Sequence, residues 1–593
     1  MPNNIFSKSD GFRSEYSSAV VRIGECMPIE GSDFLSKTLV FGTQIVVRKD
    51  QIKEGDLVIY ASNETQLSER FLSVNNLFEI SCRDKNSNAD FVNGIMAEYE
   101  PIKEKADRLR TDARNVKDSI AQMTKRAQKF NKEAKRIASE LEKTEDGTDV
   151  YRIKKGELDE LRNKADDYTR RALEKTTVYT NLKKAVEDTV NSGKHIVDEA
   201  KKHVGFFNKY GRVRCVTLKG VASFGFVFKL PELQKLYPDI TEQDLMDYEG
   251  QEFDTINGEL FCKVFIPPVK EQPQRKNKEE RDNKKLKRFD RLIDGEFKFH
   301  YDTQQLGKVI QFIKPDDIVD ISVKRHGTSI IIGKLHVKEK ISLPFPKNVW
   351  NWIVDNTGLF KSRRIKDYNV VYGPIYSSRK VIKNKYINEN VTQGYYKKDV
   401  WSEYGDIIYP YLDEGMTVYG EICGYETESE SPIQKFYDYG CGVGENNIMF
   451  YRITTTNDDG SKKEWDVSSV KDWTESLIGR MKESNDDNWK RVHPIDHLYH
   501  GTLGDLYPDL DIRSHWHESV LESIKADKEH FLMEENEPMC KNVVPREGVC
   551  IRVESDPMFC AKCKCISFGV AESIRYDQGD VDIEAEEGYS DNY

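Results

Sequence analysis

The chain has 593 residues, of which 32% are charged and 38% hydrophobic, and its formal net charge is -11. This length predicts about two to four domains, and the low hydrophobic fraction indicates a long solvated segment beside globular domains. A net negative charge excludes a uniformly basic nucleic-acid-binding protein but leaves local basic patches open. Because the sequence has no run of 18 apolar residues and no apolar signal core, we expect a cytoplasmic protein without a membrane span, whose eleven cysteines are reduced thiols.

Short alternating strands with turn residues occupy the first part of the chain. The segments AVVRI, TLVFG, QIVVRK and LVIY lie between Ser18 and about Ile80. β character returns later in RVRCVTLKG and VASFGFVF. Alternation of this kind is typical of small sheets, so we predict one β domain in two halves, residues 1–96 and 206–265.

A helical insertion, residues 97–205, separates these two halves. Apolar residues recur at spacings of three and four from Ile102 to Leu141, and a second such seam extends from Leu158 to Val186. The segment TEDGTD between the seams contains Gly147, so the pattern predicts an antiparallel coiled-coil hairpin. Each arm would extend about 60 Å. Three roles stay open for the hairpin: binding a partner protein, self-association, or reach along a substrate.

The remaining segments differ in charge and pattern. Residues 266–296 form a proline-bearing, charged linker with a basic excess, for which simple solvation and direct nucleic-acid contact both stay open. Residues 297–575 have the mixed pattern of an α/β domain. The final segment, 576–593, is acidic, and we expect it to be disordered.

Five cysteines crowd the end of the third domain. A structural zinc site needs two close ligand pairs, whereas here only Cys560 and Cys563 form a pair-like group. Small, half-buried residues on a strand are the alternative interpretation, and it is the one that the spacing favours. The remaining members of the set are Cys540, Cys550 and Cys565.

A lysine stands between two strand-like runs in VKRHGTSIIIGK, and its position is unusual for a charged side chain. The amine of Lys324 is a poor nucleophile while protonated, so covalent use of this lysine requires a site that disfavours the ammonium. Lys562 and Lys564 alternate on one face of a later strand. If they approach Lys324, we expect them to lower its pKa and to hold phosphates.

The segment KRHGTS resembles the K-x-D/H-G signature of the covalent nucleotidyltransferases, the superfamily of nucleic-acid ligases and capping enzymes. In that superfamily the lysine takes a nucleotide from a nucleoside triphosphate. Five further segments are similar to the superfamily's other elements, in the same order: YSSRK (376–380), VYGEICG (418–424), IMFYRI (448–453), REGVCIRVE (546–554) and AKCK (561–564).

This resemblance implies roles that suit the side chains. Cations stabilise a phosphoryl centre, carboxylates bind a divalent ion, and an aromatic ring stacks on a base. The implied catalytic residues are Lys324, Arg379, Lys562 and Lys564, and the implied metal ligands are Glu547 and Glu421. The implied nucleotide-binding set is Lys324, His326, Gly327, Ser378, Arg379, Glu421, Phe450, Tyr451, Glu547, Lys562 and Lys564, with Phe450 the better match for stacking and Tyr451 the second choice.

Three features point within the superfamily to one branch. His326 replaces the aspartate that is usual in DNA ligases, and the chain after Lys564 is too short for a C-terminal OB domain. The front β domain is similar to the N-terminal OB module of the Deinococcus-type ATP-dependent RNA ligases. Two features depart from the family pattern. The hairpin has no counterpart in it, and Val323 stands where many relatives have glutamate, so recognition of adenine by the side chain at position 323 is in doubt.

The expected protein is therefore an α+β multidomain chain. It has an OB-like β domain interrupted by the hairpin, followed by a mixed α/β nucleotidyltransferase domain of the ATP-grasp-like ligase type. The expected function is an ATP-dependent RNA ligase that repairs RNA through a lysyl-AMP intermediate, with Mg²⁺ or Mn²⁺ and with RNA or an RNA-containing nicked duplex as substrate. Two alternatives stay open: a GTP-dependent, capping-type guanylyltransferase, and a non-catalytic adaptor that binds nucleic-acid ends.

Overall fold

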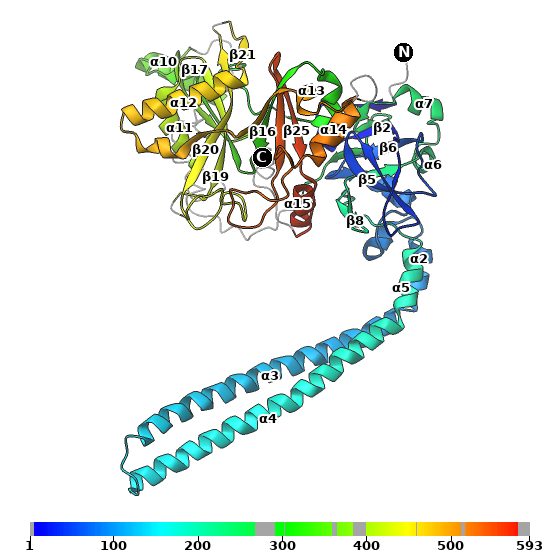
Figure 1. The fold of residues 1–593 in the computed structure, drawn as a ribbon, viewed down its shortest axis with the longest axis vertical. Coiled ribbons are helices and arrows are strands. Elements are labelled where there is room, and N and C mark those ends of the chain that lie inside the picture. The colour runs from blue at the N-terminus through cyan, green and yellow to red at the C-terminus, as the bar shows by residue number, and fades with distance from the viewer. Residues whose placement is uncertain are drawn as a thin grey trace. The chain divides into compact units, whose positions relative to one another are not determined.

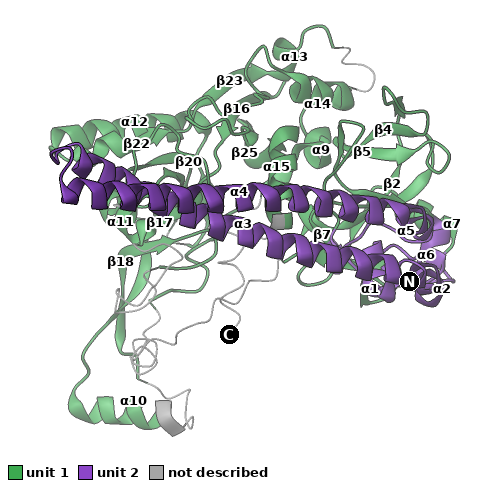
Figure 2. Cartoon of the chain, turned by 90° about the horizontal axis from the view of Figure 1, so that it is seen from below, with its two compact units in different colours: residues 1–65, 213–229, 241–593 green, residues 66–212, 230–240 purple. Residues whose placement is uncertain are grey.

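The computed structural model describes residues 5–266, 291–301, 303–357, 365–383, 399–427, 429–457, 459–510 and 516–578. They form two compact units, one of residues 1–65, 213–229 and 241–593 and the other of residues 66–212 and 230–240 (Figure 2). Within these residues, no helix is both long and apolar enough to cross a membrane. Most of the predicted linker (267–290) and of the predicted tail (579–593) lies outside the described residues.

A helical hairpin dominates the second unit (Figure 1). Helix α3 (Glu100–Leu141) and helix α4 (Asp149–Ser192) are antiparallel, since Arg126 lies 3.2 Å from Tyr168 and Lys154 lies 3.3 Å from Glu140. Gly147 has a φ of 84° in the turn between them, a conformation that glycine adopts without strain. The predicted hairpin is confirmed. The unit also contains α1 (Glu69–Val74), α2 (Ala89–Ala97), α5 (Lys194–Lys201) and α6 (Leu230–Gln234), and β7 (Thr65–Leu67) lies at its boundary.

The front of the first unit is a set of short antiparallel sheets. One has the strand order β10-β6-β2-β11 and another the order β3-β4-β5. Their buried residues, among them Val21, Ile45 and Val58, form one apolar core. The strands are β1 (Phe6–Ser7), β2 (Ser18–Arg22), β3 (Met27–Pro28), β4 (Leu35–Val40), β5 (Thr43–Arg48), β6 (Leu57–Ala61), β8 (Val216–Leu218), β9 (Val221–Ser223), β10 (Phe226–Phe228), β11 (Glu252–Phe253), β12 (Thr255–Ile256), β13 (Glu259–Leu260) and β14 (Cys262–Val264), with helix α7 (Glu242–Asp247).

Two larger sheets make up the rest of the first unit. The first has the order β15-β25-β24-β16-β23, and its strands are β15 (Gln304–Gln305), β16 (Ile318–Lys324), β23 (His497–Thr502), β24 (Gly548–Val553) and β25 (Asp556–Lys564). The second has the order β18-β17-β19-β20-β21, with β22 paired to β20, and its strands are β17 (Thr328–Lys340), β18 (Tyr368–Ser377), β19 (Met416–Gly424), β20 (Asn446–Thr456), β21 (Lys462–Glu464) and β22 (Val492–Pro494).

Each of these sheets has one apolar face covered by helices. On β16, Val319 and Ile321 are fully buried in the core that includes α14, whereas Ser322 and Lys324 point to the other face. On the second sheet, α11 and α12 cover the outer face (Figure 1) through a core that contains Trp401. The helices are α9 (Leu306–Val309), α10 (Phe345–Thr357), α11 (Val400–Ile408), α12 (Val467–Glu483), α13 (Leu503–Leu506), α14 (Trp516–Ala526) and α15 (Ile566–Gln578).

Candidate active site

A cavity of about 450 Å³ lies between the inner faces of the two larger sheets and the N-terminal segment of the first unit. Its volume is in the range of small-molecule sites. Cations and carboxylates from distant parts of the chain share its walls. The titratable side chains among its lining residues are Arg13, Glu15, Glu64, His300, Lys324, Arg325, His326, Arg379, Lys380, Glu421, Arg452, Glu547, Arg552, Lys562, Lys564 and Glu572, with the phenols Tyr16, Tyr451 and Tyr576 and the thiols Cys550 and Cys560.

Lys324 is the last residue of β16, where the chain leaves the first sheet. Only three residues separate it from β17 in the second sheet, so its side chain lies at the point where the two sheets meet. Arg325, which is 4% exposed, anchors this crossing through ion pairs to Glu537, at 2.7 Å, and to Asp496. The position of a lysine between two buried strands is thus explained by the cavity that it faces.

The ammonium of Lys324 is paired with a carboxylate. Its Nζ lies 2.8 Å from Glu547 Oε1, and Lys564 Nζ lies 3.8 Å from the same oxygen. Burial disfavours the ammonium, but the negative charges of Glu547 and Glu421 outweigh burial and raise the pKa of Lys324. Our expectation that Lys562 and Lys564 lower this pKa is therefore wrong, because the carboxylate that gathers the lysines has the larger effect.

Lys562 and Lys564 both face the cavity from β25, as their period-two spacing predicts. Lys564 pairs with Glu572 of α15 at 3.1 Å. Lys562 is buried and contacts the carboxylate of Glu15. Burial and, next, the ammonium of Lys564 lower the pKa of Lys562, whereas Glu15 favours its charged form. The carboxylates of Glu572 and Glu15 therefore oppose the loss of charge on Lys562.

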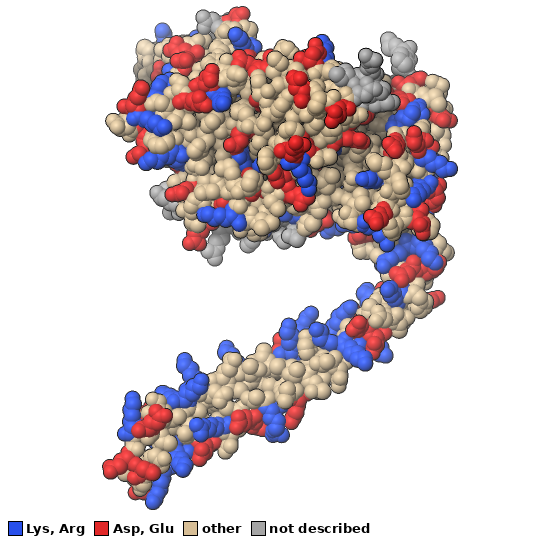
Figure 3. Space-filling model, in the orientation of Figure 1, with Lys and Arg blue, Asp and Glu red and all other residues tan. Residues whose placement is uncertain are grey.

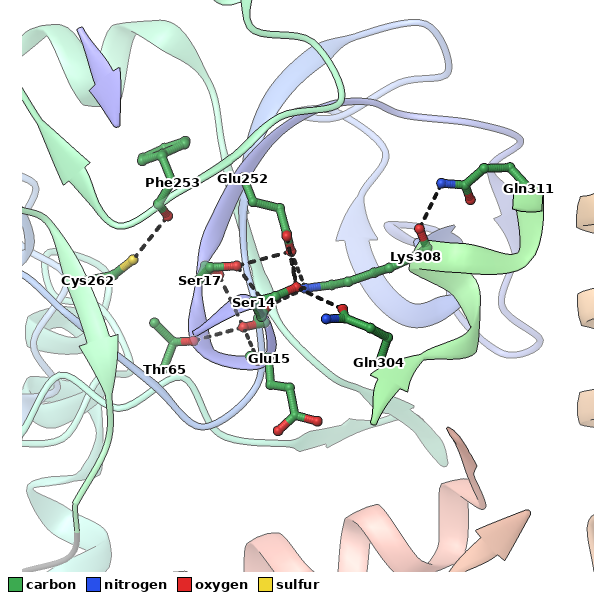
Figure 4. Close-up of polar contacts among 11 residues, drawn as sticks. Ser14, Glu15, Ser17, Thr65, Glu252, Phe253, Cys262, Gln304, Lys308 and Gln311 are labelled. Atoms are coloured by element: carbon green, nitrogen blue, oxygen red, sulfur yellow. Dashed lines mark hydrogen bonds and ion pairs between the residues drawn. The ribbon is translucent and has the colours of Figure 1, made fainter. Parts of the chain in front are cut away.

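Glu15 is held in place by the residues beside it (Figure 4). Ser14 donates to Glu252 Oε2 at 2.8 Å, and Ser62 donates to the carbonyl oxygen of Glu15 at 2.8 Å. Lys308 of α9 contacts both Glu252 and the carbonyl oxygen of Ser14. These contacts fix the short helical turn Ser14–Tyr16 against segments that are distant in the sequence, and the Glu15 side chain lines the cavity.

Gly327 and His326 complete the crossing between the sheets. A Cβ atom on Gly327 would lie 2.3 Å from the carbonyl oxygen of Ile422, so no other residue fits there without movement of β19. The amide of Gly327 donates to Glu421 Oε1 at 3.0 Å and so orients that carboxylate. His326 is 7% exposed, and Arg575 Nη1 lies 3.3 Å from its Nε2. Its imidazole packs edge-on against Tyr437 and Phe568.

The segment that follows β18 contains two predicted site residues, and only one of them lines the cavity. Arg379 lines the cavity, and its charge helps to lower the pKa of His300. Ser378 is 1% exposed and is absent from the cavity wall, because its hydroxyl takes part in a turn with Val381. The predicted contact of the Ser378 side chain with a nucleotide therefore does not fit the structure, and its observed role is to shape the turn that presents Arg379.

The two aromatic candidates on β20 lie on different faces. Phe450 is 1% exposed and packs edge-on against Trp473 of α12, so its predicted stacking on a base is corrected. Tyr451 lines the cavity, and its hydroxyl lies 3.3 Å from His300 Nδ1. The ladder between β19 and β20 skips Tyr451, since Tyr419 pairs with Arg452 and Gly420 with Phe450. Such a bulge re-aims side chains, and here it turns both Tyr451 and Arg452 toward the cavity.

Several cavity residues were not among those predicted from the sequence. Arg452 and Arg552 lie in the quoted motif segments and share Glu464, with Arg452 Nε 2.7 Å from Glu464 Oε1. Because side chains alternate along a strand, a cavity position for Cys550 would have indicated a cavity position for Arg552 as well. His300 lies outside every motif; burial, followed by Arg379 and Arg452, lowers its pKa well below the usual range, so its ring is neutral. No sequence signal marks His300 or Glu15.

The carboxylates around Lys324 suit a hard divalent cation. Glu547 is 5% exposed, and its Oε2 has no hydrogen-bond partner among the described residues. Glu421 faces the same cavity. In the described part of the chain, no group of three or more His, Cys, Asp or Glu could hold a metal. Mg²⁺ is commonly held by one or two carboxylates together with phosphate and water, and Glu421 and Glu547 could supply those carboxylates. Cys563 and Cys565 are buried in the apolar core.

Comparisons with known proteins give a distant likeness. No protein-family model matches the chain, and no curated protein matches it in sequence. A solved structure of Naegleria gruberi RNA ligase with PPi is 13% identical, with a TM-score of 0.42, and the match covers 96% of this chain and 100% of that one. A mutant of the same ligase with AMP and Mn has the same identity and TM-score, covering 94% and 98%.

Proposed function

We propose that the protein is an ATP-dependent ligase that joins RNA ends through a nucleotide carried on Lys324. The observation that supports this proposal is the position of Lys324. Lys324 is the last residue of a strand, and its Nζ lies in a cation-rich cavity, 2.8 Å from Glu547. A single amine held among phosphate-binding cations suits covalent nucleotidyl transfer, in which positioning and electrostatics supply most of the catalysis.

The reaction has three balanced steps. The neutral amine of Lys324 attacks the α-phosphorus of ATP, a P–N bond forms, and the bond to the pyrophosphate breaks. The phosphate at a 5′ end then attacks the lysyl phosphorus, the P–N bond breaks, and AMP becomes linked to that end. A 3′-hydroxyl displaces AMP and loses its proton, which forms the phosphodiester.

The cavity residues have separate tasks in these steps. Lys562, Lys564 and Arg379 stabilise the charge on the phosphates, because their cations converge on the space in front of Lys324. Tyr451 offers an aromatic face to the base. Because it is neutral, His300 can share a hydrogen bond with the Tyr451 hydroxyl and so orient the ring.

Glu547 and Glu421 would hold a divalent cation, either Mg²⁺ or Mn²⁺. When bound there, such an ion would offset the carboxylate charge that favours the ammonium of Lys324 and would reduce the repulsion between phosphates. Until the charge of Glu547 is offset, the amine stays mostly protonated and reacts slowly. The ion pair therefore keeps the nucleophile inactive in the absence of metal.

The first step tests the proposal without any nucleic acid. The wild-type protein, incubated with ATP labelled at the α-phosphate and with Mg²⁺ or Mn²⁺, should acquire a label that resists denaturant and is released by acid. Lys324→Ala should acquire none. Equal labelling of the two proteins would overturn the proposal. Competition by unlabelled GTP rather than ATP would identify the capping-type alternative. Sealing of a panel of RNA, DNA and mixed nicks should then identify the strand that must be RNA.

A further inference from the structure

The helical hairpin has very different charges on its two helices. Between Arg108 and Arg136, α3 carries three acidic residues and ten basic ones: Arg108, Arg110, Arg114, Lys117, Lys125, Arg126, Lys129, Lys132, Lys135 and Arg136. All ten are exposed. Figure 3 shows Lys and Arg gathered along the α3 edge of the hairpin, whereas both signs of charge alternate along the α4 edge. We refer to the exposed side of α3 from Arg108 to Arg136 as the basic stripe.

Helix α4 shows what an ordinary solvated helix of this hairpin looks like. Its acidic and basic residues are nearly equal in number and pair along the helix, as Arg170 does with Asp167 at 2.8 Å. Arg171 contacts the same aspartate, also at 2.8 Å. Pairs of this kind satisfy charges within the helix. Five of the ten basic residues of α4 have a carboxylate within ion-pair distance, and its nine acidic residues keep the net charge of the helix near zero.

Most charges of the basic stripe have no such partner. Seven of its ten cations have no carboxylate within ion-pair distance in the described part of the chain: Arg114, Lys117, Lys125, Arg126, Lys129, Lys132 and Lys135. Like charges at spacings of three and four destabilise an isolated helix. The apolar seam against α4, with Ala113, Ala127 and Ala134 buried, holds them in place. Repulsion between these cations therefore lowers the stability of the helix unless a polyanion lies against the stripe.

The length of the stripe and its side chains indicate which kind of polyanion it binds. It extends for about 42 Å along the helix, somewhat more than one turn of a nucleic-acid duplex at about 34 to 36 Å. Neutral donors, among them Gln122, Gln128 and Asn131, lie between the cations and can also bind phosphates. Its one aromatic residue, Phe130, is stacked on Tyr168 in the seam. Proteins that bind single strands present aromatic rings for base stacking, and the stripe presents none.

We infer that the basic stripe binds the sugar-phosphate backbone of an RNA-containing duplex, independently of its sequence. This inference rests on the proposed function, of which it specifies the substrate: an end or nick within paired RNA rather than a free single strand. It also selects one of the three roles that the hairpin pattern leaves open.

The experiment compares two matched triple variants of the full-length protein. In the first, Lys125→Gln, Lys129→Gln and Lys132→Gln remove three charges from the stripe. In the second, Lys155→Gln, Lys164→Gln and Lys184→Gln remove three exposed charges from α4. Fluorescence anisotropy measures the binding of a nicked RNA duplex and of single-stranded RNA across a series of salt concentrations, and circular dichroism reports the helix content of each protein.

The stripe variant should bind the duplex at least tenfold more weakly, and the slope of log affinity against log salt should fall by about 2 to 3, near one unit per phosphate contact removed. The α4 variant should match the wild type. Arginine in place of the three stripe lysines should restore binding. Duplex binding by the stripe variant that equals the wild type would overturn the inference, and so would equal losses of duplex and single-strand binding.

Labelling of Lys324 without nucleic acid separates this inference from the proposed function. Both triple variants should label like the wild type, because their substitutions lie only on the hairpin. Absence of labelling in the wild type would contradict the proposed function while leaving the binding result valid. A wild type that labels, with a stripe variant that binds the duplex normally, would reject only the inference about the stripe.

Discussion

Lys324 Nζ lies 2.8 Å from Glu547 Oε1, and this ion pair holds the candidate nucleophile in its charged form. Because the pair raises the pKa of Lys324, only a small fraction of the amine is neutral near pH 7. That fraction grows as the pH rises, so the rate of label transfer from ATP should increase by about tenfold per pH unit between about 6.5 and 8.5. Single-turnover labelling at several pH values measures this rate. A rate that is flat across the range would show that the amine is already neutral.

Glu547→Gln should have two opposite effects on Lys324. Loss of the carboxylate should abolish metal-dependent labelling, but it should also lower the pKa of Lys324 and make the amine react several-fold faster with trinitrobenzenesulfonate at pH 8. Mass spectrometry of the Lys324 peptide reports the second effect without ATP or metal. Glu572→Gln is the matched control, since Glu572 pairs with Lys564, and it should leave the reactivity of Lys324 unchanged. Unaltered reactivity in Glu547→Gln would contradict the role of the ion pair.

Glu15→Gln should alter nucleotide binding in a pH-dependent way. The carboxylate of Glu15 pairs with Lys562 and so competes with the phosphates of ATP for this cation. Its removal should lower the KM for ATP several-fold at pH 6.5, where Lys562 is still charged. Without Glu15, burial and Lys564 leave Lys562 with a lowered pKa, so its charge is lost as the pH rises and the advantage should disappear by about pH 9. Labelling at varied ATP concentrations gives both KM values. Glu25→Gln, at an exposed position that does not line the cavity, provides the comparison. A KM unchanged at both pH values would remove Glu15 from the site.

Tyr451→Ala and Phe450→Ala should fail in different ways. Loss of the cavity-facing ring of Tyr451 should weaken ATP binding by about 5- to 150-fold, the equivalent of one stacked base, with little change in stability. Phe450→Ala should instead destabilise the protein by about 3 to 5 kcal/mol, because it empties a packed core position beside Trp473. Equilibrium binding of ATP and the melting temperature separate the two outcomes. The reverse pattern would place Phe450, and not Tyr451, against the base.

Glu464→Gln should destabilise the domain that contains the cavity. Glu464 is 8% exposed and neutralises both Arg452 and Arg552, so its loss leaves two buried guanidinium groups without a carboxylate and should cost about 3 to 5 kcal/mol. Urea unfolding followed by tryptophan fluorescence reports this domain, since all seven tryptophans lie between Trp350 and Trp516. Glu483→Gln, at the exposed end of α12, should change the free energy of unfolding by less than about 0.5 kcal/mol. Similar values for the two variants would contradict the network.

The sequence by itself determined the parts of this protein that depend on local periodicity. Alternation along β25 was enough to put Lys562 and Lys564 on one face, and the seams of α3 and α4 were enough to predict the hairpin, because strands and helices repeat at fixed intervals. The order of the motif segments also predicted that Lys324, Glu421, Glu547 and Arg379 face one cavity.

The tertiary structure alone decided the features that depend on contacts between distant segments or on irregular backbone. The resemblance to the motif made Phe450 the better candidate, but Tyr451 lines the cavity at a bulge, and a bulge has no period from which to predict it. Glu15 enters the cavity through contacts made with residues 308 and 252, far along the chain. The direction of the Lys324 pKa shift followed from which charge lies nearer: Glu547 is at 2.8 Å, and Coulomb energy falls with distance, so the carboxylate outweighs the lysines that the sequence had indicated.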